Sequence, residues 1–163
     1  MSGISGGELG KETKSHLNKY IGLADQKASL LLTGQLAFLG LTATTLNELV
    51  SVDGGLSELF VVLTVVSGVA AILLSISVVY PRTPKAEKGV IFWENIIQYD
   101  SPDEFEAAFV DLDDSERLNR IVIQNYYLAK VASKKYCYLR WALRATIAMI
   151  LFSVGTLVSL SIM

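Results

Sequence analysis

Three long stretches of the chain contain no aspartate, glutamate, lysine or arginine. They are Ala28–Asn47, Leu59–Pro81 and Ala145–Met163, with 20, 23 and 19 residues. A helix needs about 20 mostly apolar residues to cross a hydrocarbon core about 30 Å thick. The sequence therefore predicts an all-α membrane protein with three transmembrane helices. For the third stretch, the alternative is a helix buried in a hairpin.

The distribution of basic residues predicts the orientation. Of the fourteen lysines and arginines, four precede the first stretch and ten lie between the second and the third. Basic residues stay on the cytoplasmic side of a membrane, so we expect a multi-pass protein of the cell membrane. The expected segments are a cytosolic N-terminal helix (1–27), a first span (28–47), an external loop (48–58), a second span (59–81), a small, mainly helical cytosolic sensor module (82–144) and a third span (145–163).

Helix signals organise the cytosolic parts. The N-terminal helix is expected to begin near Thr13 and to continue into the first span. The segment "VIFWENIIQY" (90–99) is predicted as a short strand or as an interfacial segment. Ser101 followed by Pro102 predicts a helix start. A last helix opens near Ser115, and because no glycine or proline interrupts residues 115–154, we expect it to run unbroken into the third span.

Two patterns predict a homo-oligomer. Residues spaced alternately four and three apart form an apolar stripe on the last helix: Leu118, Val122, Asn125, Ala129, Ala132, Tyr136, Leu139 and Leu143. Asn125 is suited to setting the register between partner helices. In the second span, Ser67, Ala71 and Ser75 form a small-residue face that permits close helix approach. The alternative is that the stripe packs against the chain's own module.

Asp25 and Lys27 stand directly in front of the first charge-free stretch. One interpretation is that Asp25 pairs with a basic residue near the start of the third span, among Lys135, Arg140 and Arg144. The two charges would then couple the cytosolic module to the spans. The alternative is that Lys27 extends to lipid headgroups while Asp25 is hydrated.

No pattern in the sequence indicates catalysis. The chain has one cysteine, Cys137, and one histidine, His16, and no cluster at metal-ligand spacing. Nucleophile-elbow, phosphate-loop, zinc-protease and dinucleotide-binding motifs are missing from the sequence. We therefore expect a protein that is not an enzyme and that uses no metal or cofactor.

A set of short motifs resembles the Pycsar effector family of small membrane proteins. "ADQKAS" enters the first span, and the second span ends in Tyr-Pro-Arg. An aromatic "IFWENI", an acidic helix and "LAKVASKKYCYLRWAL" follow in the same order as in the family. The resemblance covers residues 15–150, nearly the whole chain.

The resemblance implies a role in antiviral defence. A partner cyclase makes a cyclic pyrimidine mononucleotide, cCMP or cUMP, on phage infection, and the effector senses it and impairs the membrane. Two other functions stay open: an effector gated by a cyclic oligonucleotide, or a passive membrane scaffold that binds only protein. No nucleic acid polymer is expected as a partner.

A cyclic nucleotide requires cationic or donor groups for its phosphate and an aromatic face for its base. The candidate ligand-binding residues in the expected cytosolic module are Arg82, Phe92, Trp93, Asn95, Lys134, Lys135, Tyr136 and Arg140.

Overall fold

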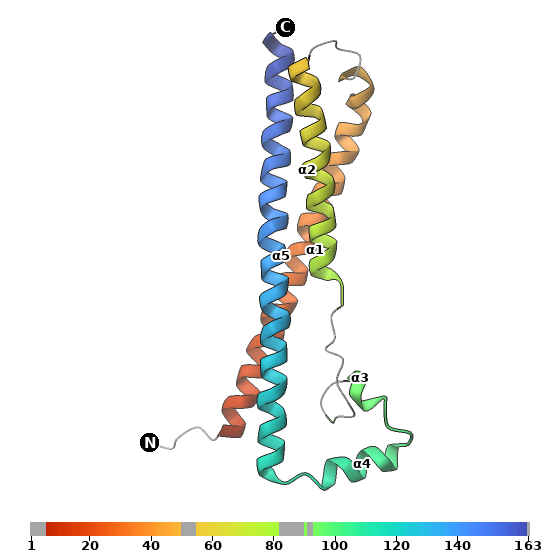
Figure 1. The fold of residues 1–163 in the computed structure, drawn as a ribbon, viewed down its shortest axis with the longest axis vertical. Coiled ribbons are helices and arrows are strands. Elements are labelled where there is room, and N and C mark those ends of the chain that lie inside the picture. Colours follow the sequence, from red (N-terminus) through yellow and green to blue (C-terminus); the bar gives the residue numbers. More distant parts are fainter. Residues whose placement is uncertain (1–5, 50–54, 82–89, 91–92, 163) are drawn as a thin grey trace. The chain divides into compact units, whose positions relative to one another are not determined.

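The regular structure of the described residues is entirely helical (Figure 1). The computed structural model describes residues 6–49, 55–81, 90 and 93–162, and of these it leaves out the side chains of 44–49, 93 and 94. The helices are α1 (Gly6–Leu49), α2 (Gly55–Val79), α3 (Trp93–Ile96), α4 (Pro102–Val110) and α5 (Asp114–Ile162). The all-α fold class is confirmed. The strand expected near Trp93 is wrong for residues 93–96, which form a single helical turn.

The chain divides into two compact units. The first, here named the cavity unit, consists of Met1–Gly22 and Pro81–Ser133. The second, the bundle unit, consists of Leu23–Tyr80 and Lys134–Met163. The boundaries fall inside α1 and inside α5, so both long helices contribute to both units.

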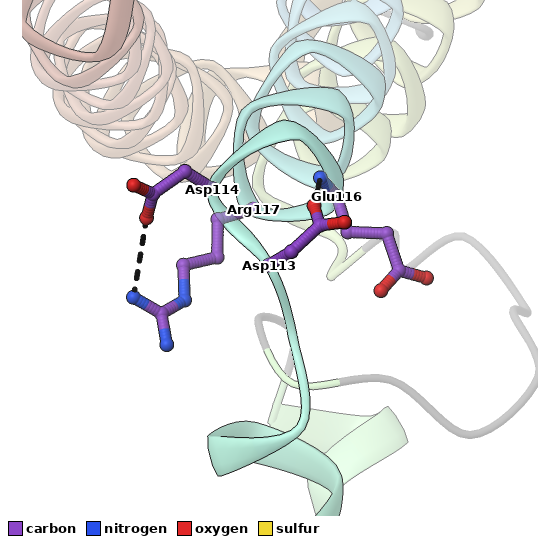
Figure 2. Close-up of polar contacts among 4 residues, drawn as sticks. All are labelled: Asp113, Asp114, Glu116 and Arg117. Carbon is purple, nitrogen blue, oxygen red and sulfur yellow. Dashed lines mark hydrogen bonds and ion pairs between the residues drawn. The ribbon is translucent and has the colours of Figure 1, made fainter.

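Local capping explains where the later helices begin. Ser101 Oγ accepts a hydrogen bond from the Glu104 amide at 3.1 Å, which confirms the predicted start of α4. At α5, Asp113 Oδ1 accepts from the Glu116 amide at 2.7 Å (Figure 2). These bonds satisfy amides that have no partner within the helix. From Asp114, α5 runs unbroken to Ile162, which confirms the predicted single helix.

The start of α1 differs from the prediction. The helix already contains Gly6, seven residues before the expected start at Thr13. The Thr13 hydroxyl does not cap the helix, because it donates to the Leu9 carbonyl at 2.9 Å. A threonine inside a helix often makes this bond to the residue four positions earlier.

Small residues bring the helices of the bundle unit together. The buried residues of α2 are spaced mostly four and three apart: Ser57, Thr64, Gly68, Ala71, Ser75 and Val78. A Cβ atom added to Gly68 would lie 3.1 Å from Met149 Sδ and 3.2 Å from Leu39 Cδ2, so α1, α2 and α5 meet there. Ala71 and Ser75 are fully buried within one chain. These two residues therefore pack within the chain.

The buried side of α5 follows a seam different from the predicted stripe. Its buried and half-buried positions include Ile121, Asn125, Leu128, Ala132, Lys135, Leu139, Ala142, Thr146 and Met149. Four predicted members, Asn125, Ala132, Tyr136 and Leu139, are buried or half-buried. The other four, Leu118, Val122, Ala129 and Leu143, are exposed. Lys135, which was not in the predicted stripe, is 4% exposed.

Two of the described helices, α2 and α5, are long and apolar enough to cross a membrane. The segment of α1 in the bundle unit is more polar and contains Gln35, which is buried there. The Gln35 side-chain amide donates to Thr146 Oγ1 at 2.7 Å, and this bond joins α1 to α5.

Candidate functional site

The cavity unit contains a cavity of about 520 Å³. Pockets that bind small molecules commonly have volumes of about 300–1,000 Å³. The described lining residues are Lys11, Lys14, Val90, Phe109, Leu112, Arg117, Arg120, Ile121 and Gln124. Four of them are cationic and none is acidic, so this lining carries a strong positive charge.

The cationic side chains come from two helices in matching pairs. Lys11 and Lys14 lie three residues apart on α1, and Arg117 and Arg120 lie three residues apart on α5. Residues with this spacing share one face of a helix. The two faces therefore bring four cations to one cavity, where a bound anion can satisfy several donors.

A close approach at Gly10 holds α1 against α5 in the cavity unit. The Asn125 side-chain amide donates to the Gly10 carbonyl at 2.9 Å. A Cβ atom at Gly10 would lie 2.8 Å from Ile121 Cγ2, which is too close for any side chain without a shift. Since Ile121 also lines the cavity, the glycine fixes the position of one cavity wall.

Arg117 is held by only one weak ion pair among the described residues. Its Nη1 lies 3.5 Å from Asp114 Oδ1 (Figure 2). The Asp114 side chain is fully exposed, and such surface pairs contribute about 0–1 kcal/mol. A guanidinium has five N–H donors, so Arg117 keeps donors for a ligand.

An aromatic series supplies the apolar part of the cavity. Tyr99 and Phe105 pack edge to face with ring centroids 5.4 Å apart, and Phe105 lies 6.2 Å from Phe109. Phe109 lines the cavity and is 52% exposed. The series therefore supports a ring whose surface is available for stacking with a flat ligand.

Gln124 places a buried amide in the cavity wall. Its side chain is 5% exposed. No described residue forms a hydrogen bond with its Oε1 atom. Most buried polar atoms have a partner, so each exception requires an explanation.

In the bundle unit, Lys135 joins three helices. Its ammonium group on α5 donates to the carboxylate of Asp25 on α1 and, at 2.8 Å, to the carbonyl of Val78 on α2. Val78 lies in the last turn of α2, where carbonyls lack helical partners. At this level α1 and α5 are joined by an ion pair between a lysine side chain that is 5% exposed and a carboxylate side chain that is 35% exposed.

An apolar cluster of Ala24, Ala28 and Val78 is buried in the same unit, with Tyr136 and Leu139 packed against it. The small alanines permit close helix contact at this level. Lys27 is exposed, so Asp25 and Lys27 occupy different environments.

The predicted ligand-binding residues lie in several places. Lys135 and Tyr136 pack in the bundle unit, where Lys134 and Arg140 are exposed. Asn95 is buried in the cavity unit, and its Oδ1 has no hydrogen-bond partner among the described residues. Arg82 and Phe92, and the side chain of Trp93, lie outside the described part of the chain. No predicted residue is among the described lining of the cavity.

Sequence reasoning therefore missed the cavity residues. A signal for them was present, because both 11–14 and 117–120 carry basic residues three apart on the polar ends of long helices. Gln124 had no comparable signal, since nothing in the sequence distinguishes a buried glutamine from an exposed one.

The described residues thus form a helical protein with two helices long and apolar enough to cross a membrane and with a basic cavity that is a candidate site for an anionic ligand. The Pycsar effector protein domain, PycTM, matches residues 10–162. The Pycsar effector protein SaPycTM of Staphylococcus aureus is 33% identical over 132 residues, which is 78% of each chain. The chain therefore belongs to the Pycsar effector family, whose members are membrane effectors of antiphage defence. No solved structure matches the chain.

Proposed function

We propose that this effector binds a cyclic pyrimidine mononucleotide, cCMP or cUMP, and in response impairs the integrity of the cell membrane. The observation that carries this proposal is the cavity, which combines four cationic side chains, the exposed ring of Phe109 and a buried amide at Gln124. The cations suit a phosphate group. The ring suits a base, because base–aromatic stacking accepts any base with a π-face.

We further propose that three segments cross the membrane. Residues 6–22 of α1 pack with residues 114–133 of α5 in the cavity unit, as the bond from Asn125 to Gly10 illustrates. If α2 and α5 each cross once, the chain reaches the far side before Gly55, so α1 also crosses. The bond between Gln35 and Thr146 supports this topology, because it pairs the buried Gln35 amide donor inside the bundle.

The same topology agrees with the charge distribution. The ten basic residues between the expected second and third spans and the four before the first would all lie on the cytoplasmic side. The cavity would then face the cytosol, where a cyclase releases its product.

Coupling from cavity to membrane is proposed to run along α1 and α5. Each helix supplies one cationic pair to the cavity and one partner of the Asp25–Lys135 ion pair to the bundle. A ligand that binds two arrangements of these helices with different affinity shifts the protein toward one of them. Loss of the ion pair would then accompany the active arrangement.

The proposal is tested by calorimetric titration of the full chain in detergent with cCMP, cUMP and a cyclic dinucleotide. We expect one of the cyclic pyrimidine mononucleotides to bind most tightly, and Lys14→Gln with Arg120→Gln to weaken it at least about tenfold. Arg140→Gln removes an exposed charge from the other unit and serves as the control. Tighter binding of the dinucleotide would favour the oligonucleotide alternative, and binding of no nucleotide would favour a scaffold.

A further inference from the structure

We propose that Gln124 recognises the hydrogen-bonding edge of the pyrimidine base, an inference that rests on the proposed function. Gln124 lines the cavity, and its Oε1 is a buried acceptor without a hydrogen-bond partner among the described residues. A buried acceptor that stays unpaired lowers stability. Because Oε1 is itself covered, the proposal requires the amide to turn toward the cavity, where a ligand N–H group would complete the bond.

The position of Gln124 on α5 fits this role. Arg117, Arg120 and Gln124 follow one another at intervals of three and four residues, so they share one face of the helix. Gln124 lies about 6 Å further along the helix axis than Arg120. A phosphate bound by the arginines therefore leaves room for the ribose before the base reaches the amide.

Phe109 adds a second constraint on the base. Its exposed ring lines the same cavity as Gln124. A base stacked on this ring presents its edge, not its face, to groups in the surrounding wall. Phe109 would then stack on the base while Gln124 binds its edge. Both contacts are separate from those to the phosphate.

The amide chemistry suits both pyrimidines. Cytosine presents an acceptor at N3 and a donor at its exocyclic nitrogen, and uracil presents a donor at N3 and an acceptor at O4. A glutamine side chain carries one acceptor and two donors. Turned one way or the other, it forms two hydrogen bonds with either base. Bidentate amide contacts of this kind discriminate between bases in other recognition sites.

The test is a cycle of one protein change and one ligand change, measured by titration of the full chain in detergent. The protein change is Gln124→Leu. The ligand change is methylation that removes the base donor: at N3 of cUMP, or twice at the exocyclic nitrogen of cCMP. We expect wild-type protein to bind the methylated nucleotide about tenfold more weakly or worse, and Gln124→Leu to bind both forms equally.

Two controls separate the possible failures. Asn119→Leu changes an exposed residue of the same helix and should behave as wild type. Gln124→Glu keeps the size of the side chain but has no donor, so it should also weaken binding of the unmethylated nucleotide. If methylation weakens binding equally in wild type and Gln124→Leu, the edge assignment is wrong while the proposed function stands. If wild type binds neither cyclic pyrimidine nucleotide, both fail.

Discussion

The ammonium of Lys135 binds the carboxylate of Asp25 and also the carbonyl of Val78, 2.8 Å away. The buried ammonium thus forms an ion pair with α1 and a hydrogen bond with a carbonyl in the last turn of α2. A buried charge is tolerated when it is paired and its other donors are used. Substitutions can therefore remove the ion pair with Asp25 and the hydrogen bond to Val78 separately.

Asp25→Leu should be strongly destabilising, because it leaves the Lys135 ammonium buried without its counter-charge. Removal of one partner of a fully buried pair costs about 3–5 kcal/mol, and we expect a smaller loss here because the Asp25 side chain is 35% exposed. Lys27→Ala, two residues away and exposed, should change the free energy of unfolding by less than about 0.5 kcal/mol. Chemical unfolding in detergent measures both. Equal effects of the two substitutions would show that Asp25 is no more than a surface charge.

A milder substitution of Asp25 tests coupling in cells. Asp25→Asn keeps an acceptor for Lys135 but removes the charge, so we expect membrane insertion to persist while the response to the signal changes. Dye entry into cells with and without an induced cyclase reports that response. Wild-type behaviour of Asp25→Asn at equal protein levels would contradict the proposed coupling.

Exchanging the charges should not restore the contact. The double variant D25K/K135D allows an ion pair between the two positions, but an aspartate at position 135 cannot donate to the Val78 carbonyl. We therefore expect the swap to remain less stable than wild type in chemical unfolding. Full recovery would mean that the bond to Val78 contributes little.

Gly10→Leu should deform the cavity, because any side chain at this position meets Ile121. Nucleotide affinity, measured by titration, should fall while the helical content stays near that of wild type. Gly7→Leu is the matched control, since a Cβ atom there has no neighbour within 4 Å. An equal loss in both variants would assign the effect to helix propensity or to the N-terminus in general.

Labelling by an impermeant thiol reagent tests the three-span topology. In a Cys137→Ser background, a cysteine replacing Leu56, which is exposed at the start of α2, should react in intact cells. Cysteines replacing Ser15 or Asn119, both exposed in the cavity unit, should react only after permeabilisation. Ser57 is unsuitable for this experiment because it is 2% exposed. Labelling at Ser15 from outside would contradict a membrane crossing by α1.

The sequence predicted those features of the fold that depend on one helix or one helix cap. Charge-free stretches, the cap at Ser101 and the unbroken course of α5 all depend on short-range patterns, and each appears in the structure. Pairing of Asp25 with a basic residue of α5 was also foreseen, although the sequence left three partners open. Only packing distinguishes the buried Lys135 from the exposed Arg140 and Arg144.

The cavity could not be predicted in the same way. Its walls come from α1, α4, α5 and neighbouring segments that are distant in sequence. Which faces meet depends on Gly10 and Ile121 packing together, a contact between positions more than a hundred residues apart. The candidates chosen from the sequence favoured residues near the third span, because basic and aromatic residues are dense there.

We propose above that ligand binding in the cavity impairs the integrity of the membrane. The most direct measurement is dye release from vesicles that contain the purified full chain, with and without cCMP or cUMP. We expect one nucleotide to trigger release from wild-type vesicles and from Arg140→Gln vesicles. Arg117→Gln with Arg120→Gln should abolish the ligand-dependent part. Release that is the same with and without nucleotide in wild type, or unchanged in the double variant, would contradict the account.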